Sequence, residues 1–400
     1  MSNPDPASPS PAGEPDEPSP PKPSQPEAAP AGPAPAPRSG RSEGRSEEAV
    51  LKRIEAWRRR PNRFTDEVVT LAHGAGGKAS DALIGAVFVD AFANKTLAPL
   101  ADGASLTLPS GDRLAFSTDS FVVKPLRFPG GSIGHLAVHG TVNDLAVMGA
   151  TPAWLSAGFV IEEGFAVSEL RAVVADMAAA ARDAGVEIVT GDTKVVDRGA
   201  ADGLYINTAG LGVVPAGREL GPELVQPGDV IVVSGTIADH GMAVMLARGD
   251  LALEADLHSD TAPLGSIVAD LLAAAPSTRW MRDPTRGGVG TVCNELARDT
   301  DLAIVLDESL LPIDPAVNGA CDLLGIDPLY VANEGKLVAV VGAEHEAAAL
   351  EALRAHPLGR RAARIGEVRA DPAGIVVLLT TFGGTRIVDM LVGDPLPRIC

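Results

Sequence analysis

Four aspartates stand in short polar stretches of the sequence. They are Asp102 in residues 101–104, Asp119 in residues 117–120, Asp144 in residues 141–144 and Asp192 in residues 191–194. Carboxylate oxygens are the ligands that Mg²⁺ prefers, and Mg²⁺ often joins such carboxylates to nucleotide phosphates. Any one aspartate in a polar turn is better explained as a cap or a turn former. As a set, the four indicate a magnesium and nucleotide site.

A glycine-rich run at residues 73–78 precedes these aspartates and suits a loop that wraps a triphosphate. The Walker spacing is absent and Ala79 follows Lys78, so a plain turn is an equal alternative. Residues 283–288 precede an expected helix, whose first backbone N–H groups favour a bound anion. Arg286 is the candidate clamp for that anion.

Three cysteines are present without any C-x-x-C pair, which excludes disulfide scaffolds and zinc ribbons. Cys293 and Cys321 lie at helical spacing from apolar residues, and we expect both to be buried. Cys400 is the last residue and follows a segment with two prolines, so we expect its thiol on a mobile arm. A thiolate there is a nucleophile able to carry an acyl-type group, and an accidental surface cysteine is an equal alternative.

Residues 333–336 precede an apolar strand expected at residues 337–341. Glu334 in this stretch is either a general base or a turn residue paired with Lys336.

The composition describes an acidic chain with a distinct beginning. The 400 residues include 33 basic and 52 acidic side chains, a formal net charge of −19. Such a charge disfavours nucleic acid and anionic membranes as partners. No apolar run is long enough for a membrane helix and no secretory signal is present, so we expect a cytoplasmic protein. Proline-rich residues 1–60 are expected to be disordered, with a short basic helix at residues 46–60 as an alternative for that part.

Alternating apolar strands and amphipathic helices begin near residue 66. The clearest helix follows Ser168 and ends at Gly185, and residues 132–148 form another that ends at Gly149. Strands are expected at 114–117, 186–189 and 230–233, the first two running into the polar stretches at 118–120 and 190–194. Open α/β sheets bind ligands at such strand ends. Breaks at residues 216–228 predict a domain boundary.

Seven stretches together resemble one family. They are LAHGAGGK (71–78), AFSTDSFVVKPLRFPGG (115–131), GTVNDLAVMGATP (140–152), VTGDTKVV (189–196), DPTRGGV (283–289), ANEGKL (332–337) and PRIC (397–400). On these motifs the chain resembles the HypE carbamoyl dehydratases of hydrogenase maturation. HypE belongs to the superfamily of aminoimidazole ribonucleotide (AIR) synthetase, selenophosphate synthetase and thiamine-monophosphate kinase. The aspartate motifs are common to that superfamily, whereas PRIC together with VTGDTKVV and ANEGKL is specific to HypE.

The resemblance implies a two-domain AIR synthetase-like fold, α/β followed by α+β. Residues 66–220 would bind ATP and form a homodimer through their sheet, residues 225–380 would cover them, and residues 385–400 would be a flexible tail. Asp102, Asp119, Asp144 and Asp192 fall on the family's acidic metal and nucleotide positions, for Mg²⁺. We assign nucleotide binding to Gly74, Gly76, Gly77, Lys78, Asp119, Asn143, Asp144, Asp192, Thr193 and Arg286.

The resemblance also implies a reaction at Cys400. That residue would receive a carbamoyl group from a HypF-type carbamoyltransferase, and ATP would phosphorylate the carbamoyl oxygen. Loss of phosphate and of the amide protons would leave a thiocyanate. Its cyano group would pass to iron on a HypC–HypD complex, as a ligand of the [NiFe] hydrogenase. We assign Glu334 as the base, and Lys194 either orients it or neutralises the phosphorylated intermediate.

Two other classes of function remain open at this stage. One is another ATP-using enzyme of the superfamily. A selenophosphate synthetase would place its reactive Cys or selenocysteine near the glycine-rich run, where this chain has Ala72 and His73, and a small-molecule kinase has no use for the PRIC tail. The other is a non-catalytic maturation scaffold whose tail only docks on a partner. The scaffold predicts neither ATP hydrolysis nor chemistry at Cys400.

Overall fold

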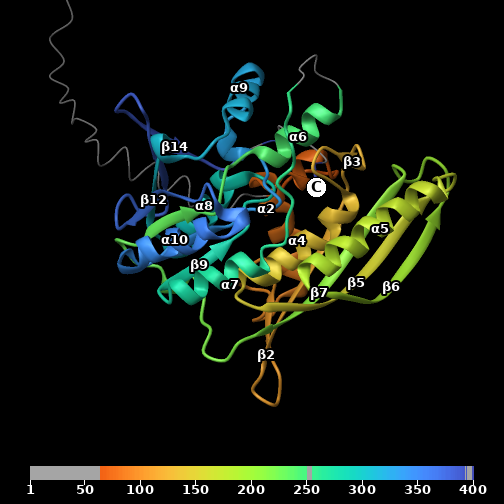
Figure 1. Ribbon diagram of the computed structural model, residues 1–400, viewed down its shortest axis with the longest axis horizontal. Coiled ribbons are helices and arrows are strands. Elements are labelled where there is room, and N and C mark those ends of the chain that lie inside the picture. Colours follow the sequence, from red (N-terminus) through yellow and green to blue (C-terminus); the bar gives the residue numbers. More distant parts are fainter. Residues whose placement is uncertain (1–63, 250–254, 392, 394–398) are drawn as a thin grey trace, which may run out of the picture. The chain divides into compact units, whose positions relative to one another are not determined.

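The computed structural model describes residues 64–249, 255–391, 393, 399 and 400, which build two β-sheets with flanking helices (Figure 1). The disorder expected at residues 1–60, and the helix considered within it, lie outside the described residues. Among the residues that are described, no helix is both long and apolar enough to cross a membrane.

The first sheet has five strands in the order β1-β2-β7-β5-β6. Their bounds are Ala104–Thr107, Arg113–Phe121, Leu204–Val214, Thr151–Glu162 and Glu187–Val196, respectively. β5 and β6 run parallel, and the other neighbours are antiparallel. The hairpin of β3 (Arg127–Phe128) and β4 (Gly131–Ser132) precedes the first long helix.

Two helices, α4 (Ile133–Val147) and α5 (Val167–Ala184), cover one face of this sheet. Residues alternate along β5 as its pleat requires: Leu155 and Ala157 are buried toward the helices, whereas Trp154 and Val160 are exposed. α4 is buried on nearly all sides because it also packs against α7 and β9 of the second half. α5 buries only one face and ends at Gly185, which adopts the left-handed conformation.

The second sheet has seven strands in the order β14-β13-β10-β12-β8-β11-β9. Their bounds are Thr385–Val388, Val376–Leu379, Ala303–Asp307, Ala363–Arg369, Val230–Val233, Val338–Val341 and Thr278–Arg282, respectively. α7 (Gly265–Ala274) and α10 (Glu346–Ala355) pack on one face, against Val230 and Val232, and α8 (Gly288–Thr300) packs on the other, against Ile231 and Val233. Burial on both faces explains why β8 is a continuous apolar run.

Shorter elements complete the chain. They are η1 (Leu71–Gly74), α2 (Lys78–Leu83), the π-helical η2 (Ile84–Val89), α3 (Asp90–Phe92), η3 (Pro222–Leu224), α6 (Asp239–Ala247), η4 (Glu308–Leu310), α9 (Pro315–Leu324), η5 (Pro328–Tyr330), η6 (Ala343–His345) and η7 (Pro357–Gly359). Cys293 on α8 and Cys321 on α9 are both buried, which confirms their expected place in the core.

Three local expectations were wrong. Residues 118–120 belong to β2 and residues 190–194 belong to β6, so neither stretch is a loop. Both strands continue because a neighbouring strand pairs with them along these residues, and threonine suits a pleated sheet. Residues 385–388 form β14 on the edge of the second sheet, so this part of the expected tail is an ordered strand.

Candidate nucleotide and metal site

Three carboxylates converge from separate elements. Asp102 precedes β1, Asp144 lies in the last turn of α4, and Asp283 directly follows β9. One oxygen of each lies within 4.8 Å of the others, a spacing that one cation can bridge. Asp119 on β2 lies close enough that its charge raises the pKa of both Asp144 and Asp283. Asp102, Asp119 and Asp144 are thus brought together as the sequence predicted, and Asp283 was missed.

The electrostatics of this cluster favour a bound cation. The pKa of Asp144 lies well above its usual range, first because the carboxyl is buried and second because of the charge of Asp119. Burial and then the charges of Asp102 and Asp119 raise the pKa of Asp283 in the same way. Ser117 Oγ donates a hydrogen bond of 2.5 Å to Asp144, which partly compensates. Since crowded carboxylate oxygens are hard ligands, the donor set fits Mg²⁺.

Two arginines border the carboxylates. Arg282 donates from Nε to Asp102 at 2.6 Å and also pairs with Glu295, which fixes the orientation of Asp102. Burial raises the pKa of Asp119, and the charge of Arg286 partly opposes that shift. Arg286 also donates from Nη1 to the Gly74 carbonyl at 3.0 Å. The glycine-rich run is therefore held beside the acidic cluster.

The same run has a backbone that suits only glycine at one position. Gly76 has a φ of +74°, and a Cβ there would lie 3.0 Å from the Arg286 carbonyl oxygen. Gly77 caps α2, and Lys78 at the start of α2 pairs with Asp389 at 2.8 Å. These contacts place the predicted phosphate-binding residues Gly74, Gly76, Gly77 and Lys78 on one loop next to Arg286.

Glu334 is a buried carboxyl that is 2% exposed, and within the described part of the chain its Oε1 atom has no hydrogen-bond partner. Burial, followed by the charges of Asp283 and Asp260, raises its pKa well above the usual range. Its backbone N–H donates to Asp260 at 3.0 Å. Lys336 also donates to Asp260, at 3.0 Å, so the alternative in which Glu334 pairs with Lys336 is wrong. A carboxyl with a raised pKa is suited to proton transfer near neutral pH.

Asn143 is tied to the backbone of the second half of the fold. Its side-chain Nδ2 donates to the carbonyls of Ala262 and Glu334, each at 3.1 Å, and its Oδ1 accepts from the N–H of Leu264 at 2.8 Å. The side chain is fully buried, and these bonds use both of its N–H donors. Asn143 therefore positions the Glu334 segment, and its direct binding of the nucleotide stays a prediction.

Asp192, Thr193 and Lys194 lie apart from the carboxylate cluster. They stand exposed on β6, the edge strand, where Lys194 Nζ bonds Asp192 at 2.6 Å. That bond lowers the pKa of Asp192, the reverse of the shift at Asp144. Within one chain, Asp192 is therefore not brought together with the other three aspartates, because β6 pairs only with β5 and β7 also lies between β5 and β2. The metal and nucleotide role of Asp192 stays a prediction.

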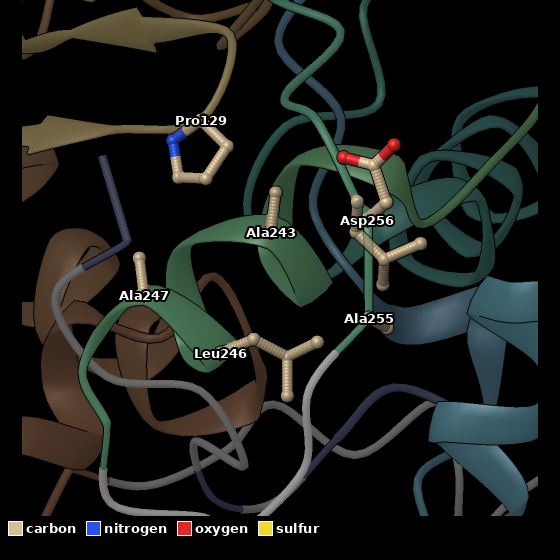
Figure 2. A pocket seen from close by; sticks show the side chains of 7 residues that line it. Pro129, Ala243, Leu246, Ala247, Ala255 and Asp256 are labelled. Carbon is tan, nitrogen blue, oxygen red and sulfur yellow. The ribbon is translucent and has the colours of Figure 1, made fainter.

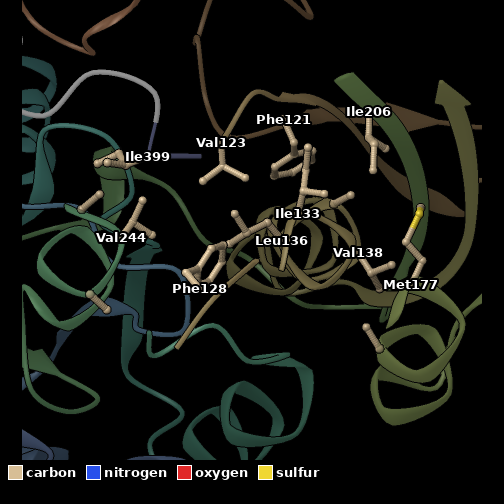
Figure 3. Packing of buried hydrophobic residues seen from close by; sticks show 14 of the residues in the cluster. Phe121, Val123, Phe128, Ile133, Leu136, Val138, Met177, Ile206, Val244 and Ile399 are labelled. Carbon is tan, nitrogen blue, oxygen red and sulfur yellow. The ribbon is translucent and has the colours of Figure 1, made fainter. Parts of the chain in front are cut away.

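The end of the chain is seated beside a hollow that Asp192 and Lys194 help to line. This hollow has a volume of about 320 Å³ and also includes Val122. The N–H of Val122 donates to a backbone carboxylate oxygen of Cys400 at 3.0 Å. Ile399 is 4% exposed and belongs to the apolar cluster around α4 (Figure 3). The last two residues thus have a defined resting place.

A larger hollow of about 490 Å³ runs along α6 (Figure 2). Pro129, Ala243, Leu246 and other mostly apolar residues line it, and Asp256 is the one charged residue among those described in its lining. Its described lining offers neither a cationic group nor a set of carboxylates to a nucleotide. The chemistry belongs to the acidic cluster, despite the greater volume of this hollow.

The fold and its carboxylate site define a protein of the AIR synthase related class. Residues 100–214 match the model of the AIR synthase related protein N-terminal domain, and residues 226–378 match that of the C-terminal domain. Carbamoyl dehydratase HypE of Rhodobacter capsulatus is 55% identical over 337 residues, which cover 84% of this chain and 99% of the relative.

Solved structures agree with the sequence relatives. A HypE–HypF complex superimposes with a TM-score of 0.74 at 46% identity, covering 78% of this chain and 100% of that one. HypE in complex with ATP gives a TM-score of 0.70 at 46% identity, covering 83% and 100%. The chain belongs to the HypE carbamoyl dehydratases of hydrogenase maturation, which confirms the resemblance seen in its motifs.

Proposed function

We propose that the chain dehydrates an S-carbamoyl group on its own Cys400 to a thiocyanate, with ATP as the second substrate. The observation that carries the proposal is the seat of Cys400, whose backbone carboxylate accepts from the N–H of Val122, three residues after Asp119. Three residues of strand span roughly 10 Å, which is within reach of a thiol-bound group and a triphosphate placed at the carboxylates. A terminal cysteine seated next to a cation site fits a group carried on sulfur and activated by ATP.

The proposed reaction has two steps, phosphorylation of the carbamoyl oxygen and then elimination of phosphate. The carbamoyl oxygen attacks the γ-phosphorus of ATP, ADP leaves, and one N–H proton is lost, giving a Cys–S–C(=NH)–O-phosphate. The second N–H proton then leaves, the C–O bond breaks, and inorganic phosphate departs with the C–O electron pair, giving Cys–S–C≡N. Phosphate is a good leaving group whereas an amide oxygen is a poor one, so ATP provides the driving force.

Particular residues of the chain serve these steps. Glu334 accepts an N–H proton, since its raised pKa and unpartnered oxygen suit a base in a water-poor place. Arg286 and the glycine loop hold phosphate oxygens. Asp102, Asp119, Asp144 and Asp283 would hold Mg²⁺, which when bound neutralises charge on the triphosphate.

Lys194 is the last residue to which we assign a role, and it lines the same hollow as Val122. It lines the hollow next to the seat of Cys400, so we assign it to neutralising the phosphorylated intermediate. The alternative, in which it orients Glu334, has no support from contacts within one chain, because its bonding partner is Asp192.

Partners form the next part of the proposal. A HypF-type carbamoyltransferase supplies the carbamoyl group, as the solved HypE–HypF complex supports, and a HypC–HypD complex receives the cyano group. The open face of the first sheet, with Trp154, Val160 and the exposed strand β6, supports a homodimer formed through that sheet. A cytoplasmic location, where ATP is plentiful, belongs to the same proposal.

Intact-mass spectrometry after incubation with carbamoyl phosphate and the HypF-type partner tests the reaction. We expect one carbamoyl group on Cys400, and the loss of one water from that adduct only when ATP and Mg²⁺ are added. Cys400→Ala should prevent the adduct and leave ATP binding intact. An adduct that keeps its water with ATP and Mg²⁺ present would contradict dehydratase activity and favour a scaffold.

A further inference from the structure

Ile399 and Cys400 lie in a pocket built by residues of both halves of the fold. The side chain of Ile399 belongs to the cluster of Val123, Phe128 and Val244, which come from the segment after β2, from β3 and from α6 (Figure 3). This cluster is continuous with the core under the first sheet. Burial of one branched aliphatic side chain contributes on the order of 2 kcal/mol, as much as one good anchor in a binding interface. The pocket therefore selects a large apolar penultimate residue.

Two groups donate hydrogen bonds to the backbone of the Ile399–Cys400 dipeptide. His240 Nε2 lies 2.7 Å from the Ile399 carbonyl oxygen, and the N–H of Val122 donates to the Cys400 oxygen at 3.0 Å. A carbonyl oxygen only accepts, so Nε2 carries the proton and donates. His240 Nδ1 then accepts from the hydroxyl of Ser259 at 2.7 Å, and Ser259 Oγ accepts from the N–H of Thr261 at 3.1 Å. Each bond in this short chain has a matched donor and acceptor.

The tautomer of His240 is fixed by its surroundings. The ring is fully buried, and Phe128 packs against it edge to face with ring centroids 5.5 Å apart. Burial lowers the pKa of His240, so the ring is neutral near pH 7. A neutral imidazole held at Nδ1 by Ser259 presents a single N–H, aimed at the tail.

The segment that holds His240 also holds the proposed base. Ser259 bonds His240, and the next residue, Asp260, accepts from the backbone N–H of Glu334 and from Lys336. Two adjacent residues thus fix the seat of the tail and the position of Glu334. The dehydration requires this arrangement, because the carbamoyl group on sulfur must meet the base at a defined distance.

We propose that His240 is a positioning residue that holds the Ile399–Cys400 dipeptide in its pocket during dehydration. This inference rests on the proposed function and adds to it the residue that sets the place of the thiol. His240 contacts the chain next to the reacting group, not the reacting atoms themselves. The partner catalyses the transfer of the carbamoyl group to Cys400, so we expect a change at His240 to affect dehydration and not that transfer.

Alkylation of Cys400 tests the pocket without ATP or any partner. Iodoacetamide labelling, followed by peptide mass spectrometry, compares the wild type with three variants, and buried Cys293 and Cys321 serve as references. Loss of one net hydrogen bond should raise the labelling rate at Cys400 about tenfold in His240→Ala. Glutamine places an N–H close to the position of Nε2, so His240→Gln should restore protection. Asparagine reaches only the position of Nδ1, so His240→Asn should behave as alanine does.

The second measurement separates the two steps of the reaction. In His240→Ala and His240→Asn we expect carbamoylation at the wild-type rate, an unchanged KM for ATP, and loss of water slowed about tenfold. His240→Gln should approach the wild type. Equal dehydration rates in all three variants would overturn the proposal, whereas a wild type that never loses water would instead overturn the proposed function.

A tail variant keeps the test valid if His240 substitutions disturb folding. Ile399→Ser changes the penultimate residue and leaves the rest of the core intact. We expect faster labelling of Cys400 and slower dehydration, and the lost burial of Ile399 should lower the free energy of unfolding by at most about 2 kcal/mol. Labelling and dehydration rates equal to the wild type would contradict the pocket.

Discussion

Asp144 and Asp192 stand in polar stretches of similar composition, but they lie in regions with opposite electrostatics. Asp144 faces Asp102 and Asp283 where two halves of the fold meet, and burial raises its pKa. Asp192 lies on an edge strand with an exposed side chain, and the bond from Lys194 lowers its pKa. In the first region buried carboxylates outnumber the bordering arginines, so the region favours a cation, whereas in the second Lys194 pairs with Asp192. The burial of a carboxylate therefore indicates a cation site better than the number of carboxylates in the surrounding motif does.

The largest effect on stability is expected at Arg282, the arginine that pairs with two carboxylates of the buried region. Arg282→Met removes the partner of both Asp102 and Glu295 and leaves two mostly buried carboxylates unpaired. We expect a loss of about 3 kcal/mol in the free energy of unfolding, measured by urea denaturation. Arg361→Met, which breaks an exposed pair with Asp314, is the matched control and should have little effect. A small loss for Arg282→Met would mean that the carboxylates are better hydrated than their burial indicates.

The largest loss of activity is expected at Asp283, the proposed metal ligand that the sequence did not predict. Asp283→Asn removes one charge from the proposed metal site, so ATP-dependent loss of water should slow by about 100-fold. Transfer of the carbamoyl group should remain at the wild-type rate. Asp270→Asn, an exposed substitution of the same kind on α7, is the control. Dehydration at the normal rate in Asp283→Asn would remove this residue from the site.

The pH dependence of stability should separate the two regions further. In the folded chain the pKa of Asp144 lies above its unfolded value, so the folded state binds more protons and its stability falls as pH rises through that window. The window opens near pH 4, the ordinary value. Asp144→Asn removes this cost, and without Mg²⁺ it should exceed the wild type by about 1 kcal/mol at high pH.

Urea unfolding from pH 4 to pH 8 with a chelator measures that difference. It should shrink toward pH 4, where the folded wild-type carboxyl is protonated and the unfolded one is about half protonated. The pKa of His139 is lowered by burial to about 3, which gives an opposite slope, but one common to both proteins. Addition of Mg²⁺ should reverse the order of stability. A difference that grows as the pH falls would contradict the raised pKa.

The smallest effect on stability is expected in the exposed region. Lys194→Met breaks an ion pair between two solvated side chains, and the midpoint of urea unfolding should not change measurably. If Lys194 neutralises the phosphorylated intermediate, the loss of water should nevertheless slow about tenfold, with carbamoylation intact. Lys95→Met changes an exposed lysine distant in sequence and should affect neither. A large drop in stability would show that Lys194 has a structural role.

Local sequence patterns predicted much of the fold. The spacing of Val173 and Met177 with a glycine at 185 is enough to define α5, because helix periodicity and termination depend on near neighbours. The apolar run at β8 was predicted for the same reason. The ends of β2 and β6 were not, because the pairing of residues 118–120 and 190–194 with neighbouring strands depends on distant parts of the chain.

For the site, the sequence by itself determined the residue types: aspartates near strand ends, a glycine-rich run, a glutamate before a strand and a terminal cysteine. Tertiary structure alone decided which of them share a place. It joined Asp283 to Asp102 and Asp144, placed Asp192 on a separate edge strand, and used Asn143 to hold the Glu334 backbone. It also seated Ile399 against His240, a contact across 159 positions of sequence. Motifs specify chemistry locally, whereas desolvation and charge crowding arise only when distant segments pack together.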